Sequence, residues 1–197
     1  MIPIHNENPT NCTPYVTWAL IVANILAFIW QVRVGLERSV MQMGFIPADF
    51  HAGDWSAAGH SLSSMFLHGG LLHLIGNLWF LRIFGDNVED EMGHLRFLIF
   101  YVVCGLAADA AHFLSAPTSE IPVVGASGAI SGVLGAYLMK HPMAPVKMWT
   151  GFLLLPFTEL PAFVFLFLWG GMQLLLAMAS IGAKDGGGIA YWAHLGG

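Results

Sequence analysis

Apolar runs of about 20 residues recur along this chain of 197 residues. A helix of roughly that length crosses the hydrocarbon core of a bilayer. The runs predict five helices, over residues 15–34, 64–84, 95–115, 126–140 and 161–181. A sixth apolar run starts near Gly188 and stops at Gly197. About ten residues are too few to cross a bilayer as a helix, so we expect the last span to be truncated in this chain.

Composition supports a membrane environment. Hydrophobic residues make up 56% of the chain and charged residues only 10%, whereas soluble domains carry about a quarter charged residues. The net charge of −5 is spread thinly and forms no basic patch, which excludes nucleic acid as an expected partner. Cys12 and Cys104 lie in a tail and in an apolar run, so no disulfide framework is expected. We therefore expect an all-α, polytopic membrane protein with the lipid bilayer as its surroundings.

The chain divides into a short tail and one transmembrane domain. Residues 1–14 form the expected N-terminal tail, and residues 15–197 form the domain. The long connection 35–63 mixes aromatic residues with glycines and a few charges. It is either an amphipathic loop that lies in the membrane interface or an ordinary solvated loop. Pro156 and Pro161 interrupt the apolar stretch before the fifth helix, so that stretch is expected to be interfacial or buried rather than a separate span.

The distribution of basic residues slightly favours a cytoplasmic N-terminus, because four of the seven Lys and Arg residues then lie on the cytoplasmic side. With that orientation, three basic residues lie outside, and the four on the cytoplasmic side are Arg82, Arg96, Lys140 and Lys147. Short cytoplasmic loops carry an excess of such residues.

Polar side chains inside the predicted spans are the first candidates for function, because burying them in lipid is costly. His73 and Asn77 are four residues apart and share one helical face. An interhelical hydrogen bond would explain them without chemistry. Asp109 and His112 are three apart, and we favour a structural interpretation in which they satisfy each other.

The stretch "VVGASGAISGVLGAY", residues 123–137, combines small residues with Ser127. Gly128 and Gly132 have the spacing that lets two membrane helices approach closely. Ser127 opens the predicted helix and could be no more than an N-cap. The same position also offers free backbone N–H groups and a positive dipole end, which suit an oxyanion.

His194 lies beside Gly196 and Gly197 in the final run, "GGGIAYWAHLGG". A lone histidine there would usually be a satisfied core residue, but a serine nucleophile needs a base, and imidazole is the usual one. If the glycines let the fourth and sixth helices touch, Ser127 and His194 would meet. The two motifs together predict a Ser–His pair.

Taken together, these residues resemble the rhomboid family of intramembrane serine proteases, and the bacterial members in particular. The resemblance rests on "HLIGN" (73–77), "GASG" (125–128) and "AHLGG" (193–197), in that order. It implies a six-helix bundle with a water-filled cavity open to the outer face. Ser127 would be the nucleophile and His194 the general base. The oxyanion would be held by the side chains of Asn77 and His73 and by the Ser127 backbone N–H.

The resemblance also implies the partners and the setting. The substrates would be transmembrane segments of membrane proteins, cleaved without a metal or any other cofactor, and the location would be a bacterial inner membrane. The connection 35–63 matches the family's first loop, which lies partly in the membrane. The helix at 161–181 resembles the element proposed to open sideways for the substrate.

Two departures from the family pattern stand out. Many members have a Trp-Arg pair in the first loop, whereas Trp55 is followed here by Ser56. Some members carry an aromatic residue one turn after the nucleophile, where it packs on the catalytic histidine. This chain has Ser131 there, which leaves the support of His194 unexplained.

Two other functions are compatible with parts of the pattern. A catalytically silent rhomboid-like protein would bind transmembrane helices without cutting them, although Ser127 and His194 are both intact. A transporter or channel could use His73, Asp109 and His112 as a proton path, but the chain shows no internal repeat of the kind common in transporters.

Overall fold

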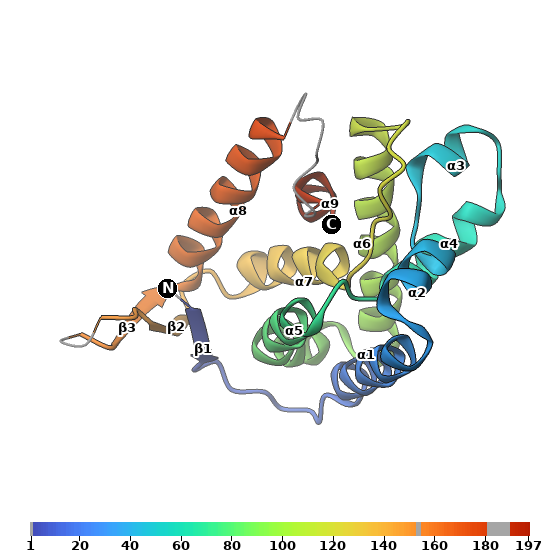
Figure 1. Cartoon of the computed structure of the whole chain (residues 1–197). Helices are drawn as coiled ribbons and strands as arrows, with labels where there is room; N and C mark the ends of the chain where they lie inside the picture. Colours follow the sequence, from blue (N-terminus) through green and yellow to red (C-terminus); the bar gives the residue numbers. More distant parts are fainter. Residues whose placement is uncertain (1, 153–154, 181–189) are drawn as a thin grey trace.

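The computed structural model describes residues 2–152, 155–180 and 190–197. These residues form a helical bundle with a small three-stranded sheet (Figure 1). The elements in chain order are β1 (Ile2–Asn6), α1 (Tyr15–Val34), α2 (Leu36–Met43), α3 (Pro47–His51), α4 (Ser56–Ser64), α5 (Leu71–Met92), α6 (His94–Ser115), α7 (Ser127–Lys140), β2 (Pro145–Trp149), β3 (Phe157–Pro161), α8 (Ala162–Ala179) and α9 (Tyr191–Gly196). By length and composition, α1, α6 and α8 are able to cross a membrane.

Helix α1 shows how the bundle reverses the pattern of a soluble protein. Its buried stripe contains the polar residues Thr17, Asn24 and Gln31, whereas large apolar side chains such as Leu26 and Val32 are exposed. Lipid is as apolar as leucine, so outward-facing apolar residues are well solvated in a bilayer and inward-facing polar residues find partners. The bounds of α1 match the predicted range 15–34.

Four predicted helices match closely, and α5 does not. Helices α6, α7 and α8 begin and end within two residues of the predicted bounds. Helix α5 begins seven residues later than expected, directly after Gly69 and Gly70, and continues to Met92 instead of ending at 84. It ends where Gly93 adopts φ 76°, a backbone conformation that favours glycine. The expected sixth run is represented by α9, and its start near Gly188 lies outside the described residues.

Helix α5 extends beyond the predicted bound because its acidic side chains have hydrogen-bond donors. The predicted bound at 84 lies just before the acidic residues Asp86, Glu89 and Asp90. The Asp90 carboxylate accepts hydrogen bonds from the backbone N–H groups of Asn11 and Cys12. The helix therefore continues, because its carboxylates are satisfied by the segment that precedes α1.

The sheet corrects the expectation of an all-α chain, so the protein is mostly helical. Strand β2 pairs antiparallel with both β1 and β3. Residues 2–6 of the expected N-terminal tail thus form a strand, and α5 holds it through the Trp79 indole, whose Nε1–H donates to Pro3 O at 2.6 Å. Prolines 142, 145, 156 and 161 prevent a continuous helix between α7 and α8. The backbone groups there are satisfied by strand pairing instead.

The connection 35–63 contains three short helices, α2, α3 and α4. It pairs with the segment that leads into α7: Phe45 and Val123 exchange backbone hydrogen bonds of 3.1 and 2.7 Å. The N–H of Gly125 donates to Ser64 O at 2.9 Å. The connection therefore positions the residues directly before Ser127. Its placement in the membrane interface stays a prediction.

Helices α6, α7 and α9 pack through small residues. A Cβ atom on Gly128 would lie 2.4 Å from Ala108 Cβ of α6, and one on Gly132 would lie 2.3 Å from Cys104 Sγ of the same helix and 2.8 Å from Gly197 O. The two glycines therefore face α6 as well as α9, whereas the sequence interpretation assigned them to the last helix alone. Such close approach is what small-residue spacing provides in membrane helices.

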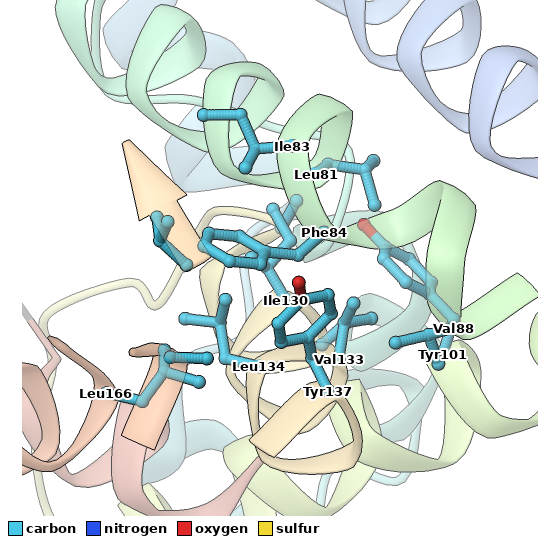
Figure 2. Packing of buried hydrophobic residues seen from close by; sticks show 14 of the residues in the cluster. Leu81, Ile83, Phe84, Val88, Tyr101, Ile130, Val133, Leu134, Tyr137 and Leu166 are labelled. Carbon is cyan, nitrogen blue, oxygen red and sulfur yellow. The ribbon is translucent and has the colours of Figure 1, made fainter. Parts of the chain in front are cut away.

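The apolar core lies beneath this contact and joins α5, α6, α7 and α8 (Figure 2). Phe84 of α5 packs edge to face on Tyr137 of α7, with ring centroids 4.9 Å apart. Phe84 also stacks on Phe165 of α8. These rings fill the bundle on the side where α7 ends, opposite to Ser127 at its start.

One buried carboxylate joins α1 to the end of α5. Glu89 has no exposed surface and accepts hydrogen bonds from the N–H groups of Val16 and Thr17, at 2.9 and 2.7 Å. The Thr17 hydroxyl donates a third, at 2.7 Å, and His94 Nδ1 lies 2.5 Å away. A carboxylate at a helix N-terminus also interacts favourably with the helix dipole.

This arrangement predicts the effect of Glu89→Ala. The substitution leaves two backbone N–H groups and a hydroxyl of α1 without their acceptor, so we expect the free energy of unfolding to fall by about 3 kcal/mol. Glu91→Ala is the matched control, because Glu91 makes only partly exposed ion pairs with Lys140 and His141, and it should cost less than about 1 kcal/mol. Thermal unfolding in detergent micelles measures both. Equal losses would show that the buried cluster does not hold α1.

Candidate active site

Ser127 is the first residue of α7, and its hydroxyl faces α9. Ser127 Oγ lies 2.8 Å from His194 Nε2. The two residues are 67 positions apart in the sequence and meet because α7 packs on α9. Helices α8 and α6 also pack on α9 (Figure 1). The structure thus places the two residues of the expected pair within hydrogen-bonding distance.

The other nitrogen of His194 decides the direction of this bond. His194 Nδ1 lies 2.8 Å from Oε1 of Gln173, on α8. A carboxamide oxygen only accepts hydrogen bonds, so Nδ1 carries the hydrogen and Nε2 has a free lone pair. The Ser127 hydroxyl therefore donates to Nε2. This is the tautomer that a general base needs.

Aromatic support for His194 also comes from α8. The Trp169 ring stacks on the imidazole, with centroids 6.3 Å apart and an interplanar angle of 29°. Ser131, in the place of the family's aromatic residue, donates its hydroxyl hydrogen to Ser127 O at 2.7 Å. The sequence interpretation missed Gln173, and it assigned Trp169 to the element that opens for the substrate rather than to the support of His194. A glutamine within an otherwise apolar helix, four residues after a tryptophan, was the signal available.

His73 and Asn77 of α5 line the same cavity as Ser127 and His194. The Gly69 N–H points to His73 Nδ1 at 3.4 Å, which leaves the hydrogen of the neutral ring on Nε2. A Cβ atom on Gly125 would lie 2.8 Å from His73 Nε2 and 3.5 Å from Ser127 Oγ. The edge of the His73 ring that carries Nε2 therefore lies against the backbone beside the serine.

Asn77 has one amide hydrogen left for a ligand. Its Nδ2 donates to His73 O at 2.9 Å, and a carboxamide nitrogen has two hydrogens. The side chain is buried against the cavity wall, 6% exposed. No hydrogen bond among the described residues uses the second hydrogen.

The start of α7 supplies further donors. No side chain caps this helix, and the N-cap residue is Ala126. The alternative that Ser127 is merely an N-cap is therefore wrong, because its Oγ bonds His194 and not the backbone. The first N–H groups of a helix have no partner within it. Ser127 and Gly128 thus border the cavity with their N–H groups free of intrahelical bonds.

The cavity has a volume of about 780 Å³ and runs between α5, α6, α7, α8 and α9. Its polar wall includes Ser127, His194, His73 and Asn77, and the apolar wall includes Phe80 and Trp169. Within residues 2–152, 155–180 and 190–197, no three His, Cys, Asp or Glu side chains are grouped so as to hold a metal ion.

Asp109 lies on the cavity wall but is bound elsewhere. It accepts hydrogen bonds from Ser61 Oγ at 2.5 Å and Ser64 Oγ at 3.2 Å, both on α4. The expected Asp109–His112 pair is wrong, because the carboxylate takes hydroxyl donors from the long connection and leaves buried His112 Nδ1 unpartnered in the described part of the chain. His68, expected inside the second helix, instead lies before α5 and is fully buried.

Comparison with known proteins matches the chain to one family. The family model described as "Rhomboid domain" matches residues 56–197. The chain is 42% identical over 79 residues to RHOMBOID-like protein 5 of Arabidopsis thaliana, covering 40% of this chain and 26% of that protein. It is 33% identical over 132 residues to Rhomboid protease GluP of Bacillus subtilis, covering 65% of this chain and 25% of that protein. The chain thus spans about a quarter of the length of these relatives.

The geometry around Gly125 predicts that this position tolerates no side chain. Gly125 has φ 126°, which strains any other residue, and an added methyl group would press on the His73 ring. We expect Gly125→Ala to lower the free energy of unfolding by about 2 kcal/mol. Gly76→Ala is the control, since Gly76 lines the same cavity, lies in α5 and has nothing within 4 Å of an added Cβ. Thermal unfolding of both variants measures the change. Similar losses of stability in the two variants would refute the claim that position 125 tolerates no side chain.

Proposed function

The chain belongs to the rhomboid family and is an integral membrane protein, and on that premise we propose that it is an intramembrane serine endopeptidase that uses a Ser127–His194 dyad. The observation that carries the proposal is the 2.8 Å contact between Ser127 Oγ and a His194 Nε2 whose lone pair is free. The family includes proteases, among them the Bacillus subtilis relative. It also includes rhomboid-like proteins whose names claim no protease activity.

The proposed reaction begins with attack of Ser127 Oγ on the carbonyl carbon of a peptide bond. His194 Nε2 takes the hydroxyl proton as the C–O bond forms. The carbonyl oxygen becomes an oxyanion, held by the Ser127 N–H, by His73 Nε2–H and by the second amide hydrogen of Asn77. His194 then gives its proton to the leaving amine as the C–N bond breaks. Water from the cavity hydrolyses the resulting acyl-enzyme by the same sequence of proton transfers.

Water reaches the dyad through the cavity described above. Ser127 and His194 are both partly buried, and the basic residues Arg96 and Lys140 lie at the start of α6 and the end of α7, away from Ser127. If these basic residues face the cytoplasm, the Ser127 end of α7 faces the outer side. The cavity would then admit water from outside the cell.

The proposed substrates are transmembrane segments of membrane proteins. A peptide bond within a helix is hydrogen-bonded and shielded, so the segment must unwind before Ser127 can attack it. Segments weakened by glycine or proline near the outer end unwind most readily. We further propose a bacterial inner membrane as the location, which the similarity to the Bacillus subtilis relative supports.

The first prediction of the proposed function concerns Ser127→Ala in full-length protein reconstituted into liposomes. Removal of the hydroxyl should abolish cleavage of a single-span test substrate and labelling by a fluorophosphonate, while thermal unfolding stays unchanged. A gel assay for the cleaved substrate and a fluorescent probe measure the two activities. Cleavage equal to that of the wild type would refute the nucleophile. A folded wild-type protein that binds the substrate helix but neither cuts nor labels would be a silent rhomboid-like protein.

The second prediction concerns the oxyanion donors. Asn77→Ala removes one donor and should lower kcat by roughly 10²–10³-fold, because loss of a single oxyanion-hole donor has about that effect. Labelling by the fluorophosphonate should fall in parallel. Leu78→Ala is the matched control, as the next residue on α5. If the two variants lose similar activity, Asn77 holds no oxyanion.

A further inference from the structure

Gln173 is a polar side chain placed where the bundle would otherwise be apolar. It is the only residue of α8, "AFVFLFLWGGMQLLLAMA", with a carboxamide or ionisable group. Its side chain is buried, 6% exposed, and it lines the cavity between α7 and α9. A buried carboxamide is costly unless it is hydrogen-bonded. Its Oε1 has a partner in His194 Nδ1, at 2.8 Å.

We propose that Gln173 is a positioning residue for the reaction: its carbonyl holds the Nδ1–H of His194, so that Nε2 faces Ser127 as the proton acceptor. This inference rests on the proposed protease function. A neutral imidazole exchanges between two tautomers, and only the one with hydrogen on Nδ1 can accept the serine proton. Gln173 does not touch the reacting atoms, and it acts through His194.

Trp169 completes the support from the same helix. It lies four residues before Gln173, on the same face of α8, and stacks on the imidazole with an interplanar angle of 29°. The indole restricts tilt of the ring, and the Gln173 carbonyl restricts its rotation. Helix α7 contributes no comparable support one turn below Ser127, because Ser131 is small and its hydroxyl is bound to Ser127 O. The orientation of the base therefore depends on how α8 packs against α9.

Few titratable groups surround His194 within the described part of the chain. His73 of α5 and Asp109 of α6 share its cavity, and the carboxylate of Asp109 is bound by Ser61 and Ser64. Tyr191 of α9 lies edge to face, with ring centroids 6.4 Å apart. Helix α7 presents Ser127, and α8 presents no ionisable group. Among the described residues, a carboxylate introduced at position 173 would thus be the only anion directly on the Nδ1 side.

The test compares Gln173→Met and Gln173→Glu with Leu174→Met as the matched control. Methionine keeps the length and volume of glutamine but removes the carbonyl acceptor, so kcat and the rate of fluorophosphonate labelling should fall by about 10–100-fold with little change in KM. Glutamate restores an acceptor for Nδ1–H and should recover the rate to within about fivefold of the wild type. Leu174 is exposed on the surface of the bundle, and Leu174→Met should behave as the wild type.

The pH profile separates positioning from packing. A carboxylate at position 173 stabilises the imidazolium, so in Gln173→Glu the acid limb of the rate profile should move to higher pH by about one unit or more. A merely structural amide would make Gln173→Glu at least as damaging as Gln173→Met, because it introduces a buried charge. The proposal is overturned if Gln173→Met keeps the wild-type kcat. It is also overturned if Gln173→Glu is as slow as Gln173→Met at every pH.

A measurement on the wild-type protein does not depend on how the variants fold. Nitrogen-15 NMR of protein labelled at histidine, with the His194 signals identified by their loss in His194→Ala, reports which ring nitrogen carries the hydrogen. We expect Nδ1, and hydrogen on Nε2 overturns the proposal. The Ser127→Ala variant separates failure of the proposed protease function from failure of the Gln173 role. If Ser127→Ala still cleaves the substrate, the proposed dyad is wrong. If Ser127→Ala is inactive and Gln173→Met is not impaired, only the positioning role fails.

Discussion

The close contact of α6, α7 and α9 underlies the rest of the structure. In a bilayer no hydrophobic force drives one apolar helix onto another, so association depends on tight packing and on hydrogen bonds. Gly128, Gly132 and Gly196 remove the side chains that would separate these helices. The resulting approach brings Ser127 Oγ to His194 Nε2 at 2.8 Å. The proximity of these two side chains on two helices is therefore a consequence of backbone packing.

The buried polar groups divide into those that hold the bundle and those that shape the cavity. Glu89 and Gln31 link α1 to its neighbours: Glu89 accepts from the first turn of α1, and Gln31 Oε1 accepts from the His68 N–H at 2.8 Å. Asp109 joins α4 to α6. Gln173 differs from these, because its partner is the proposed base. For each of these four side chains, the cost of burial in a lipid environment is offset by a specific partner.

The differences between expectation and structure have identifiable physical causes. Helix α5 runs to Met92 because its late carboxylates find backbone donors in the segment before α1 and in the first turn of α1, and no local pattern reveals such partners. The sheet pairs residues 2–6 with residues 145–149, which lie far apart in sequence. Asp109 binds serines of the long connection instead of His112 three residues away. In each case the observed structure depends on hydrogen-bond partners that are distant in the sequence, whereas the prediction used only neighbouring residues.

The sequence alone determined the membrane class of this protein, the bounds of α1, α6, α7 and α8 within two residues, and the four candidate residues Ser127, His194, His73 and Asn77. These follow from local properties: apolar length, glycine spacing and short motifs. Tertiary structure alone decided that Gln173 and Trp169 of α8 support the imidazole, that Gly125 lies against the His73 ring, and that Nε2 of His194 is the free nitrogen. The reason is that orientation and tautomer depend on atoms brought together from several helices, and a one-dimensional pattern does not specify those distances.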